Sequence, residues 1–326
     1  MYRIPRRCLL LAAATLLLAA QPAVAQSGKT STLIVPYPPG SAFDNVARQI
    51  QGELGKSIDR TLVVENVPGA SGSIGAQRLL GADPSAPTMM IGSANELALP
   101  PLTLSSVRYK PEDFRMVAQL TSGALALLAR PNLPANNVGE LVAYGKRPGA
   151  APLTFGSTGN GSIFHIVGVD FGKRLALPMT HVPYKGGAPA VQDLIGGQID
   201  MVFLPLIPTY IQMAKEGRIK VLAMLSPDAH AALPDVPSVD RTPELRGMHY
   251  AMWTGLFVSA KAKAATVAEL NKAANLIVGS PGFRAWVGER GNQPGQVLNP
   301  EQAAAFFDAE SRRFERLARD INLERE

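Results

Sequence analysis

Two turns rich in glycine and hydroxyl residues carry the side chains that could bind a small molecule. The first turn covers residues 38–44 and the second covers residues 156–162. Each turn follows a short apolar run and precedes an amphipathic segment, so each predicts a strand, a tight connection and a helix. Unpaired amides at a helix N-terminus attract anions, and serine and threonine hydroxyls add neutral donors. We therefore predict that the two turns hold a carboxylate without the help of lysine or arginine.

Simpler interpretations of these residues stay open. Either turn alone could merely close a tight connection and cap the helix that follows. Asp44 could face the site and accept a hydrogen bond from a ligand, or it could only complement the dipole of its own helix. His165, in the first turn of the second helix, could contact a ligand or a backbone carbonyl group. The repetition of the same device in two regions of the chain favours binding.

The sequence lacks the local motifs of several enzyme classes. Ser157 and Ser162 do not have the flanking glycines of a nucleophile elbow. Phe164 stands where a dinucleotide-binding fingerprint beginning at Gly159 needs its third glycine. None of the four histidines has a histidine or cysteine partner at a spacing suited to a metal. We expect no cofactor, no metal and no catalysis, although carboxylates converging from distant positions could still form an exported α/β enzyme acting on an acid.

The N-terminal segment, residues 1–25, predicts export. Three arginines precede an uncharged apolar run at residues 8–20, which is too short to span a bilayer. Small residues at Ala23 and Ala25 form a cleavage pattern, so we expect cleavage near Ala25 and a periplasmic protein. The pair Arg6 and Arg7 leaves general secretion and twin-arginine export both open. The single cysteine, Cys8, lies in this segment, so the mature chain should contain no disulfide.

The charge pattern is not that of a nucleic-acid-binding protein. The formal net charge of +6 falls to +3 once the three arginines of residues 1–25 are removed, and the other basic residues are scattered. No second apolar run is long enough to span a membrane. We expect a soluble monomer that binds a small molecule and no nucleic acid.

Short apolar runs alternate with amphipathic segments along most of the chain, which is typical of strands joined by helical crossovers. We predict an α/β protein of two domains, with a hinge and a ligand cleft between them. The first domain is discontinuous and comprises residues 26–123 and 252–326, and the second comprises residues 124–251. An amphipathic segment at residues 300–323 predicts a C-terminal helix that packs on the first domain.

Motifs along nearly the whole chain resemble the solute receptors of tripartite tricarboxylate transporters, also called Bug receptors. Residues 35–40 with Asp44 and Arg48 resemble the first loop of the family, and residues 65–76 resemble its second loop. Residues 156–165 resemble its ligand loop, while residues 181–200 and 233–237 are similar to further family motifs. The sequence departs from the family pattern at residues 41–43 and at residues 83–87.

The resemblance implies a periplasmic-binding-protein-like fold in which two α/β domains close over the ligand. It implies a receptor that captures a small carboxylate, such as a di- or tricarboxylate, an amino acid or an aromatic acid. The implied partners are the membrane permease subunits of the transporter or, alternatively, a sensor protein. From the turns and the resemblance we predict the ligand-binding residues Tyr37, Gly40, Ser41, Ala42, Asp44, Ser93, Asn95, Ser157, Thr158, Gly159, Gly161, Ser162, His165, Tyr184, Gly186 and Asp200.

Overall fold

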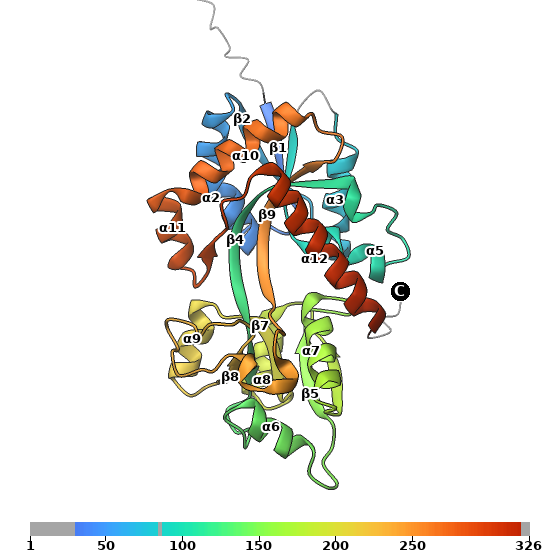
Figure 1. Cartoon of the computed structure of the whole chain (residues 1–326), viewed down its shortest axis with the longest axis vertical. Helices are drawn as coiled ribbons and strands as arrows, with labels where there is room; N and C mark the ends of the chain where they lie inside the picture. The colour runs from blue at the N-terminus through green and yellow to red at the C-terminus, as the bar shows by residue number, and fades with distance from the viewer. Residues whose placement is uncertain (1–29, 84–86, 321–326) are drawn as a thin grey trace, which may run out of the picture.

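The chain folds into two α/β domains joined by long strands (Figure 1). The computed structural model describes residues 30–83 and 87–320. The segment predicted to direct export therefore lies outside the described residues. The prediction of a two-domain α/β fold is confirmed, whereas the residue boundaries of the domains stay a prediction.

The first domain is built on parallel strands covered by helices. Strand β1 pairs in parallel with β2 on one side and with β3 on the other, and β3 pairs antiparallel with β9. The strands here are β1 (Thr30–Val35), β2 (Thr61–Asn66), β3 (Thr88–Gly92), β9 (Ala251–Ser259) and β10 (Gln293–Pro294). The α-helices are α2 (Ala42–Ser57), α3 (Ser73–Leu80), α4 (Ala94–Leu97), α5 (Pro100–Thr103), α10 (Ala264–Gly279), α11 (Pro281–Gly288) and α12 (Pro300–Asp320), with the 3-10 turns η1 (Ala70–Gly72) and η2 (Pro111–Asp113).

The second domain repeats this plan with fewer strands. Strand β5 pairs in parallel with β6 and with β7. The strands are β5 (Leu153–Ser157), β6 (Met179–Pro183), β7 (Met201–Pro205) and β8 (Lys220–Met224). The α-helices are α6 (Val138–Gly145), α7 (Ile163–Arg174), α8 (Gly187–Ile195) and α9 (Pro208–Lys215), with the 3-10 turns η3 (Val239–Arg241) and η4 (Pro243–Leu245).

The connection between the domains is made by β4 (Phe114–Ala129), a strand of 16 residues. It pairs antiparallel with β9 as far as Ala124 and then with β7 from Leu125 onward. The single strand thus belongs to both sheets, and β9 returns beside it. Two adjacent strands crossing between two compact bodies provide a hinge.

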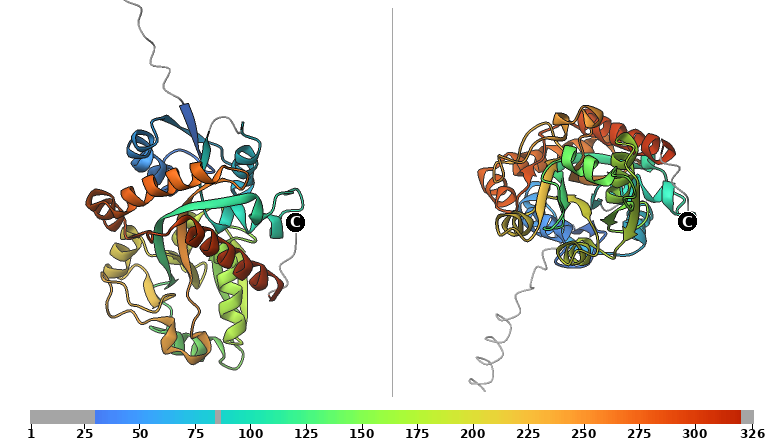
Figure 2. Two further views of the ribbon diagram at one scale, coloured as in Figure 1. Left: turned by 45° about the horizontal axis from the view of Figure 1, so that its top comes forward. Right: turned by 90° about the horizontal axis from the view of Figure 1, so that it is seen from below.

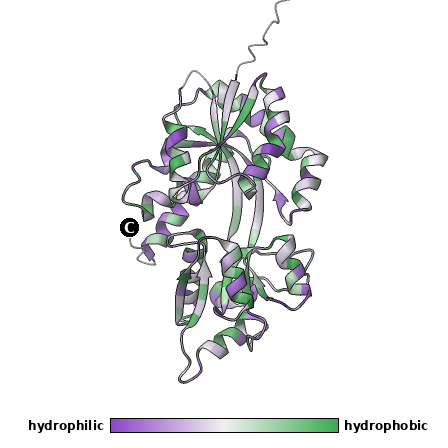
Figure 3. Cartoon of the chain, turned by 180° about the vertical axis from the view of Figure 1, so that it is seen from behind, coloured by the Kyte–Doolittle hydropathy of each residue, from purple (hydrophilic) through white to green (hydrophobic). Residues whose placement is uncertain are grey.

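Side-chain alternation explains how the first domain is filled. Leu33 and Val35 of β1 pack in a core on the side of α2 and α10, whereas Ile34 packs in the core on the opposite face. Strand residues point alternately to the two faces of a sheet, so a continuous apolar run indicates a strand buried on both sides. Figure 3 shows hydrophobic residues concentrated on the central strands of this domain.

The C-terminal helix α12 contacts both domains. Phe307 and Phe314 are buried, and Trp253 of β9 donates to the Glu310 carboxylate at 3.2 Å. Farther along, the Lys173 ammonium group on α7 donates to the backbone oxygen of Asp320 at 2.5 Å. Figures 1 and 2 show α12 running diagonally from the first domain to the side of α7. The helix therefore packs on the first domain as predicted and also reaches the second.

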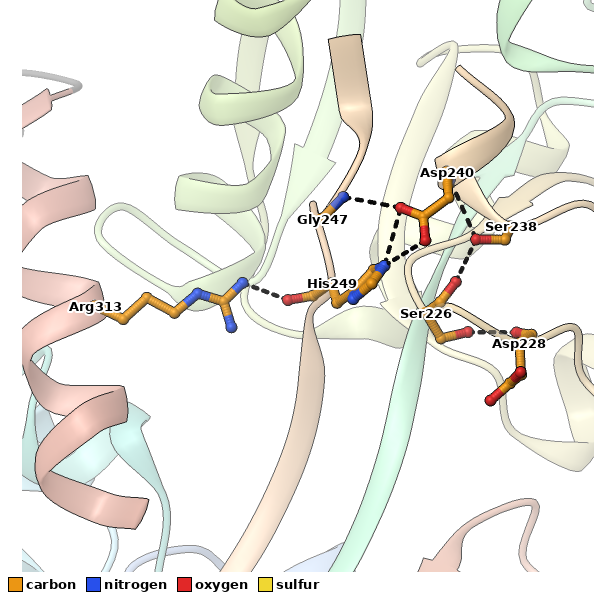
Figure 4. A network of polar contacts seen from close by, with 7 residues as sticks. All are labelled: Ser226, Asp228, Ser238, Asp240, Gly247, His249 and Arg313. Atoms are coloured by element: carbon orange, nitrogen blue, oxygen red, sulfur yellow. Dashed lines mark hydrogen bonds and ion pairs between the residues drawn. The ribbon is translucent and has the colours of Figure 1, made fainter. Parts of the chain in front are cut away.

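A polar network lies where β9 enters the hinge (Figure 4). The His249 ring contacts the Asp240 carboxylate at 2.9 Å, and Arg313 of α12 donates to the backbone oxygen of His249. The Arg313 guanidinium also lies 4.3 Å from the centroid of the Tyr250 ring. These contacts tie α12 to the start of the crossing strand.

Candidate ligand-binding site

A pocket of about 380 Å³ lies between the two domains and is lined by both. The first domain contributes the ends of β1 and β3 and the starts of α2, α4 and α5, and the second contributes the turns after β5 and β6. The N-cap residues of the two helices that follow the predicted turns, Ser41 of α2 and Ser162 of α7, both border this pocket. The lining residues are Tyr37, Ser41, Phe43, Ser71, Asn95, Leu99, Pro100, Thr103, Thr158, Asn160, Gly161, Ser162, Phe164, Lys185, Gly186 and Met252.

The first turn is held in shape by the carboxylate of Asp44. Asp44 is only 2% exposed, and it accepts hydrogen bonds from the Gly40 amide at 2.8 Å, from Asn66 at 3.0 Å and from Arg48 at 2.9 Å. The hydrogen bond from Arg48 is the main reason that the pKa of Asp44 falls to about 2, so the group is an anion at neutral pH. Asp44 does not line the pocket, and its partners all belong to the first domain. The contacts give it the role of organising the turn.

The second turn is organised by hydroxyl groups. The Ser162 hydroxyl accepts from the His165 amide at 3.3 Å and donates to the Gly159 carbonyl at 2.8 Å. Ser157, which is 1% exposed, donates to the same Gly159 carbonyl at 2.9 Å. Thr158 lines the pocket, and within the described residues its hydroxyl has no hydrogen bond to another group. This turn therefore presents a free hydroxyl and the amide end of α7 to the pocket.

The two sides of the pocket touch each other directly. The Ile163 amide at the start of α7 donates to the Asn95 side-chain oxygen on α4 at 3.4 Å. A Cβ atom placed on Gly161 would lie 2.3 Å from the Thr103 side chain on α5. Gly161 also has a φ of +69°, which favours glycine. Only glycine fits here while the domains are in this arrangement, so the two domains are in contact at the pocket.

A third turn, which the sequence prediction did not include in the site, completes the first-domain side. Ser71 lines the pocket from η1, where it has a φ of +53°. The turn packs tightly, since a Cβ atom on Gly72 would lie 2.4 Å from the Glu96 side chain. The glycine-rich motif at residues 69–75 was the available signal for this segment.

A buried glutamate supports the pocket floor, and the sequence prediction also missed it. Glu96 is fully buried and accepts hydrogen bonds from the Tyr37 hydroxyl and, at 2.7 Å each, from the amide and the hydroxyl of Ser93. Burial raises the pKa of Glu96. The spacing of Ser93 and Glu96 is that of a capping box, which is the local signal for this pair. Ser93 therefore positions Glu96, and Glu96 positions Tyr37 at the pocket wall.

The rest of the wall combines apolar surface with one cation. The Tyr37 and Phe43 rings pack with centroids 4.8 Å apart. The apolar wall consists of Phe43, Leu99, Pro100, Phe164 and Met252. Lys185 is the one charged side chain among the lining residues, and it lies on the turn after β6. The sequence predicts a site without lysine, and the turn at residues 185–186 brings one to the pocket.

Seven of the residues predicted from the sequence line the pocket, namely Tyr37, Ser41, Asn95, Thr158, Gly161, Ser162 and Gly186. Eight others lie within or beside the segments that surround it without lining it, namely Gly40, Ala42, Asp44, Ser93, Ser157, Gly159, His165 and Tyr184. Tyr184 donates to Asp193 at 2.7 Å, and burial is the main cause that raises its pKa to about 12.

The remaining predicted residue, Asp200, lies at the opposite end of the sheet. Its carboxylate accepts from the Thr154 amide at 2.8 Å and from Arg130 at 2.9 Å. Asp200 directly precedes β7 and Thr154 is the second residue of β5, whereas the pocket lies at the carboxyl end of β5. Parallel strands place their starts and ends at opposite edges, so Asp200 belongs to the edge away from the pocket.

The described residues contain no group of three or more His, Cys, Asp or Glu side chains that could hold a metal ion. Within the same part of the chain, none of the helices has the length and apolar character needed to cross a membrane.

Comparison with known proteins places these features in a family. The sequence-family model described as the tripartite tricarboxylate transporter family receptor matches residues 46–323 of this chain. A UPF0065 protein from the tcbD–tcbE intergenic region of Pseudomonas sp. strain P51 is 29% identical over 90% of this chain and 86% of its own length. Two solved structures of Rhodopseudomonas palustris proteins are each 26% identical to this chain. The structure with adipate has a TM-score of 0.78, and the match covers 91% of this chain and 98% of the adipate-bound chain. The structure of MatC with bound malate has a TM-score of 0.73, and the match covers 88% of this chain and 98% of MatC.

Proposed function

Because this chain belongs to the tripartite tricarboxylate transporter receptor family, we propose that its interdomain pocket captures a small carboxylate and that domain closure retains it. The receptor binds its solute without transforming it. Export removes residues 1–25, and the mature monomer acts in the periplasm. The complex then presents the ligand to the membrane permease subunits of a tripartite tricarboxylate transporter, and a sensor protein is the alternative partner.

The observation that carries this proposal is the meeting of two helix beginnings at one pocket. The caps Ser41 and Ser162 come from different domains and border the same space of about 380 Å³. In the proposed complex the Thr158 hydroxyl donates to the carboxylate, the positive end of the α7 dipole lies beside it, and the Lys185 ammonium adds a positive charge nearby. A binding site of this kind needs no covalent step, which supports a receptor over an enzyme.

The walls indicate how the rest of the ligand is held. Phe43, Leu99 and Phe164 offer apolar surface to a carbon chain or ring. Ser41, Ser71 and Asn95 offer polar groups on the first-domain side, directly or through bridging waters. The related structures with malate and adipate hold dicarboxylates. A small dicarboxylate fits the proposed arrangement, and amino acids and aromatic acids are the other classes to be tested.

Native mass spectrometry of the protein purified from a periplasmic extract tests the proposal. A closed cleft should retain a small acid, which the released mass identifies. A carboxylate library can then be screened by thermal unfolding, since a ligand at 100 times its Kd stabilises the protein by about 2.7 kcal/mol. Recovery of the unchanged acid supports the receptor function. Chemical conversion of the acid during incubation, or no shift with any acid, contradicts it.

Replacing one hydroxyl tests the site itself. Thr158→Val removes the free hydroxyl and preserves the side-chain shape, so affinity for the identified acid should fall by roughly 1–3 kcal/mol while stability is retained. The matched control is Thr180→Val on the exposed part of β6, outside the pocket. Isothermal titration should find the control unchanged. Equal affinities for both variants would remove the second turn from the site.

A further inference from the structure

Two histidines lie stacked beside the second turn of the pocket. The rings of His165 on α7 and His181 on β6 have centroids 3.8 Å apart and an interplanar angle of 12°. The Phe155 ring packs against them, with its centroid 5.1 Å from that of His181 and 6.3 Å from that of His165. Neither histidine lines the pocket. Their effect on a ligand must therefore pass through the turn that they contact.

Each ring is bonded to a different part of that turn. The Gly161 amide donates to Nδ1 of His165 at 3.1 Å, so this nitrogen must be unprotonated. Nε2 of His181 lies 2.6 Å from the Ser157 hydroxyl oxygen. That hydroxyl oxygen also accepts from the Gly159 amide at 3.1 Å and donates its proton to the Gly159 carbonyl. All these contacts are satisfied together when His181 donates from Nε2. His165 must then be neutral and protonated at Nε2, whereas His181 can donate to Ser157 in either charge state.

We propose that His165 and His181 are positioning residues for the ligand, because they hold the turn at residues 157–162 in the ligand-binding shape. His165 can hold Gly161 only while its own ring is neutral, and His181, stacked on it, holds Ser157. The inference rests on the proposed function in that this turn is the one that receives the carboxylate. Neither histidine lines the pocket, and through the turn the pair would make solute capture depend on pH.

A proton on either ring opposes this arrangement. Protonated His165 would carry an N–H group at Nδ1 facing the N–H group of Gly161, so an attraction would become a repulsion. A charge on His181 would lie in stacked contact with His165 in a half-buried environment. Burial lowers the pKa of His165, and burial followed by the neighbouring His165 lowers the pKa of His181 to about 4. The neutral pair is thus strongly favoured in the folded turn.

No carboxylate offsets this preference. On α7, Asp170 pairs with Arg174 and accepts from Tyr250, and Lys173 donates to Asp320 of α12. After β6, Tyr184 donates to Asp193, and Lys185 lies at the pocket. Of the described groups, His165 is the one whose charge acts on the pKa of His181, and burial is the one cause acting on His165.

The direction of the pH effect follows from these shifts. An opened turn exposes the imidazoles and returns their pKa toward the ordinary value of about 6.5. The opened state therefore binds more protons than the closed one, and acid favours opening. The contribution of the pair to turn stability is complete above about pH 6.5 and is lost as the pH falls toward 4.

Hydrogen exchange of the ligand-free full chain tests this without knowledge of the solute. Exchange in the peptide covering residues 157–165 is measured by mass spectrometry at pH 7.5 and at pH 5, and is corrected for the intrinsic pH dependence of exchange. The expected result is a loss of protection of roughly tenfold or more at pH 5, confined to this turn and the start of α7. Protection that is the same at both pH values would overturn the proposal.

Two variants distinguish a positioning role from a general structural role. Each keeps the hydrogen bond of the histidine but has a side chain that cannot take up a proton. His165→Asn retains an acceptor for the Gly161 amide, and His181→Gln retains a donor for the Ser157 hydroxyl. Each should keep the protection at pH 7.5 and reduce its loss at pH 5. The matched control is His230→Asn, because Nδ1 of His230 also accepts a backbone amide, that of Ala232 at 3.1 Å, away from the pocket. This control should respond to pH like the natural chain. Should a variant fold poorly by circular dichroism, the natural chain and the other variant still decide the outcome.

Affinity measurements then distinguish this inference from the proposed function. If the natural chain binds the identified acid, its affinity should fall by roughly tenfold between pH 7.5 and pH 5, and the fall should be smaller in His165→Asn. Binding that is independent of pH in the natural chain would contradict the histidine role and leave the receptor function intact. An absence of binding at every pH, combined with a pH-dependent turn, would contradict the receptor function and leave only the control of the turn by the histidines intact.

Discussion

The residue with the most unusual backbone at the pocket is Ser71. Gly69, Ala70, Ser71 and Gly72 have successive φ angles of +127°, +44°, +53° and +83°. Residues other than glycine cost about 1–2 kcal/mol each in this region. Strain of this kind persists where the surrounding packing imposes it, and here it brings a hydroxyl group to the ligand space. We therefore assign the strained turn to binding rather than to folding.

Ser71→Gly should separate the two effects. Relief of strain is partly offset by the greater freedom of glycine in the unfolded chain, so the free energy of unfolding should rise by up to about 1 kcal/mol. Affinity for the identified acid should fall because the hydroxyl is lost. Ala70→Gly is the matched control, since it relieves strain beside the pocket without removing a lining residue. Urea unfolding and calorimetric titration measure both quantities, and a destabilised Ser71→Gly protein would refute the assignment of strain.

At the scale of elements, the start of α2 depends on a local charge network. The Asp44 carboxylate joins the turn before the helix, through Gly40, to Arg48 one helical turn later. Asn66 at the end of β2 binds both the Asp44 carboxylate and the Tyr37 carbonyl, each at 3.0 Å. The helix start is thereby fixed against the sheet, and Ser41 is fixed at the pocket.

Asp44→Asn should weaken this element in a pH-dependent way. The pKa of about 2 lies below the ordinary value of 3.8, so Asp44 adds stability above about pH 4 and loses it as the pH falls toward 2. At pH 7 the variant should be less stable by roughly 1–2 kcal/mol, and the difference from the natural chain should shrink near pH 3. Urea unfolding at the two pH values measures this. A difference that is the same at pH 3 and pH 7 would exclude the charge network as its cause.

For the whole molecule, closure is limited by the fit between the domains. The hinge strands β4 and β9 contribute only Met252 to the described lining of the pocket, while Gly161 and Thr103 meet across the pocket. Helix α12 links both domains through Arg313 and Lys173. Motion about the strands must therefore separate the Gly161 and Thr103 surfaces while α12 keeps its packing on the first domain.

Gly161→Ala should hinder closure without unfolding either domain. The new Cβ atom would lie 2.3 Å from the Thr103 side chain, which an open cleft avoids. Affinity for the acid should fall at least tenfold, because closed protein would be scarce. The additional change Thr103→Gly should restore much of the loss. Small-angle scattering with saturating acid should find the single variant more extended than the natural chain. An unaltered affinity of Gly161→Ala would contradict the idea that Gly161 and Thr103 must meet for the cleft to close.

Local features of the site could be read from the amino-acid order because they depend on few neighbouring residues. The sequence predicts Ser41 and Ser162 as ligand donors in turns before helices and leaves capping open as an alternative. Both residues cap a helix, a property determined within four residues of the chain, and both line the pocket. Thr158 and Gly161 followed from the same turn. The family resemblance added Gly186. The two-domain α/β fold followed from alternating apolar runs, which reflect burial of each strand.

The site residues that the sequence did not predict depend on contacts between segments that are distant in the chain. The residues next to Ser71, Glu96 and His181 in the sequence do not show that these side chains serve one pocket. They come together because separate strands end at one edge of a sheet. Asp200 stands in a family motif, yet the direction of β7 places it at the other edge, beside Arg130. The sequence by itself determined where helices begin and which strands are buried, since these are short-range properties. Only the tertiary structure decided which turns face each other, because that depends on sheet order and on how the hinge brings the domains together.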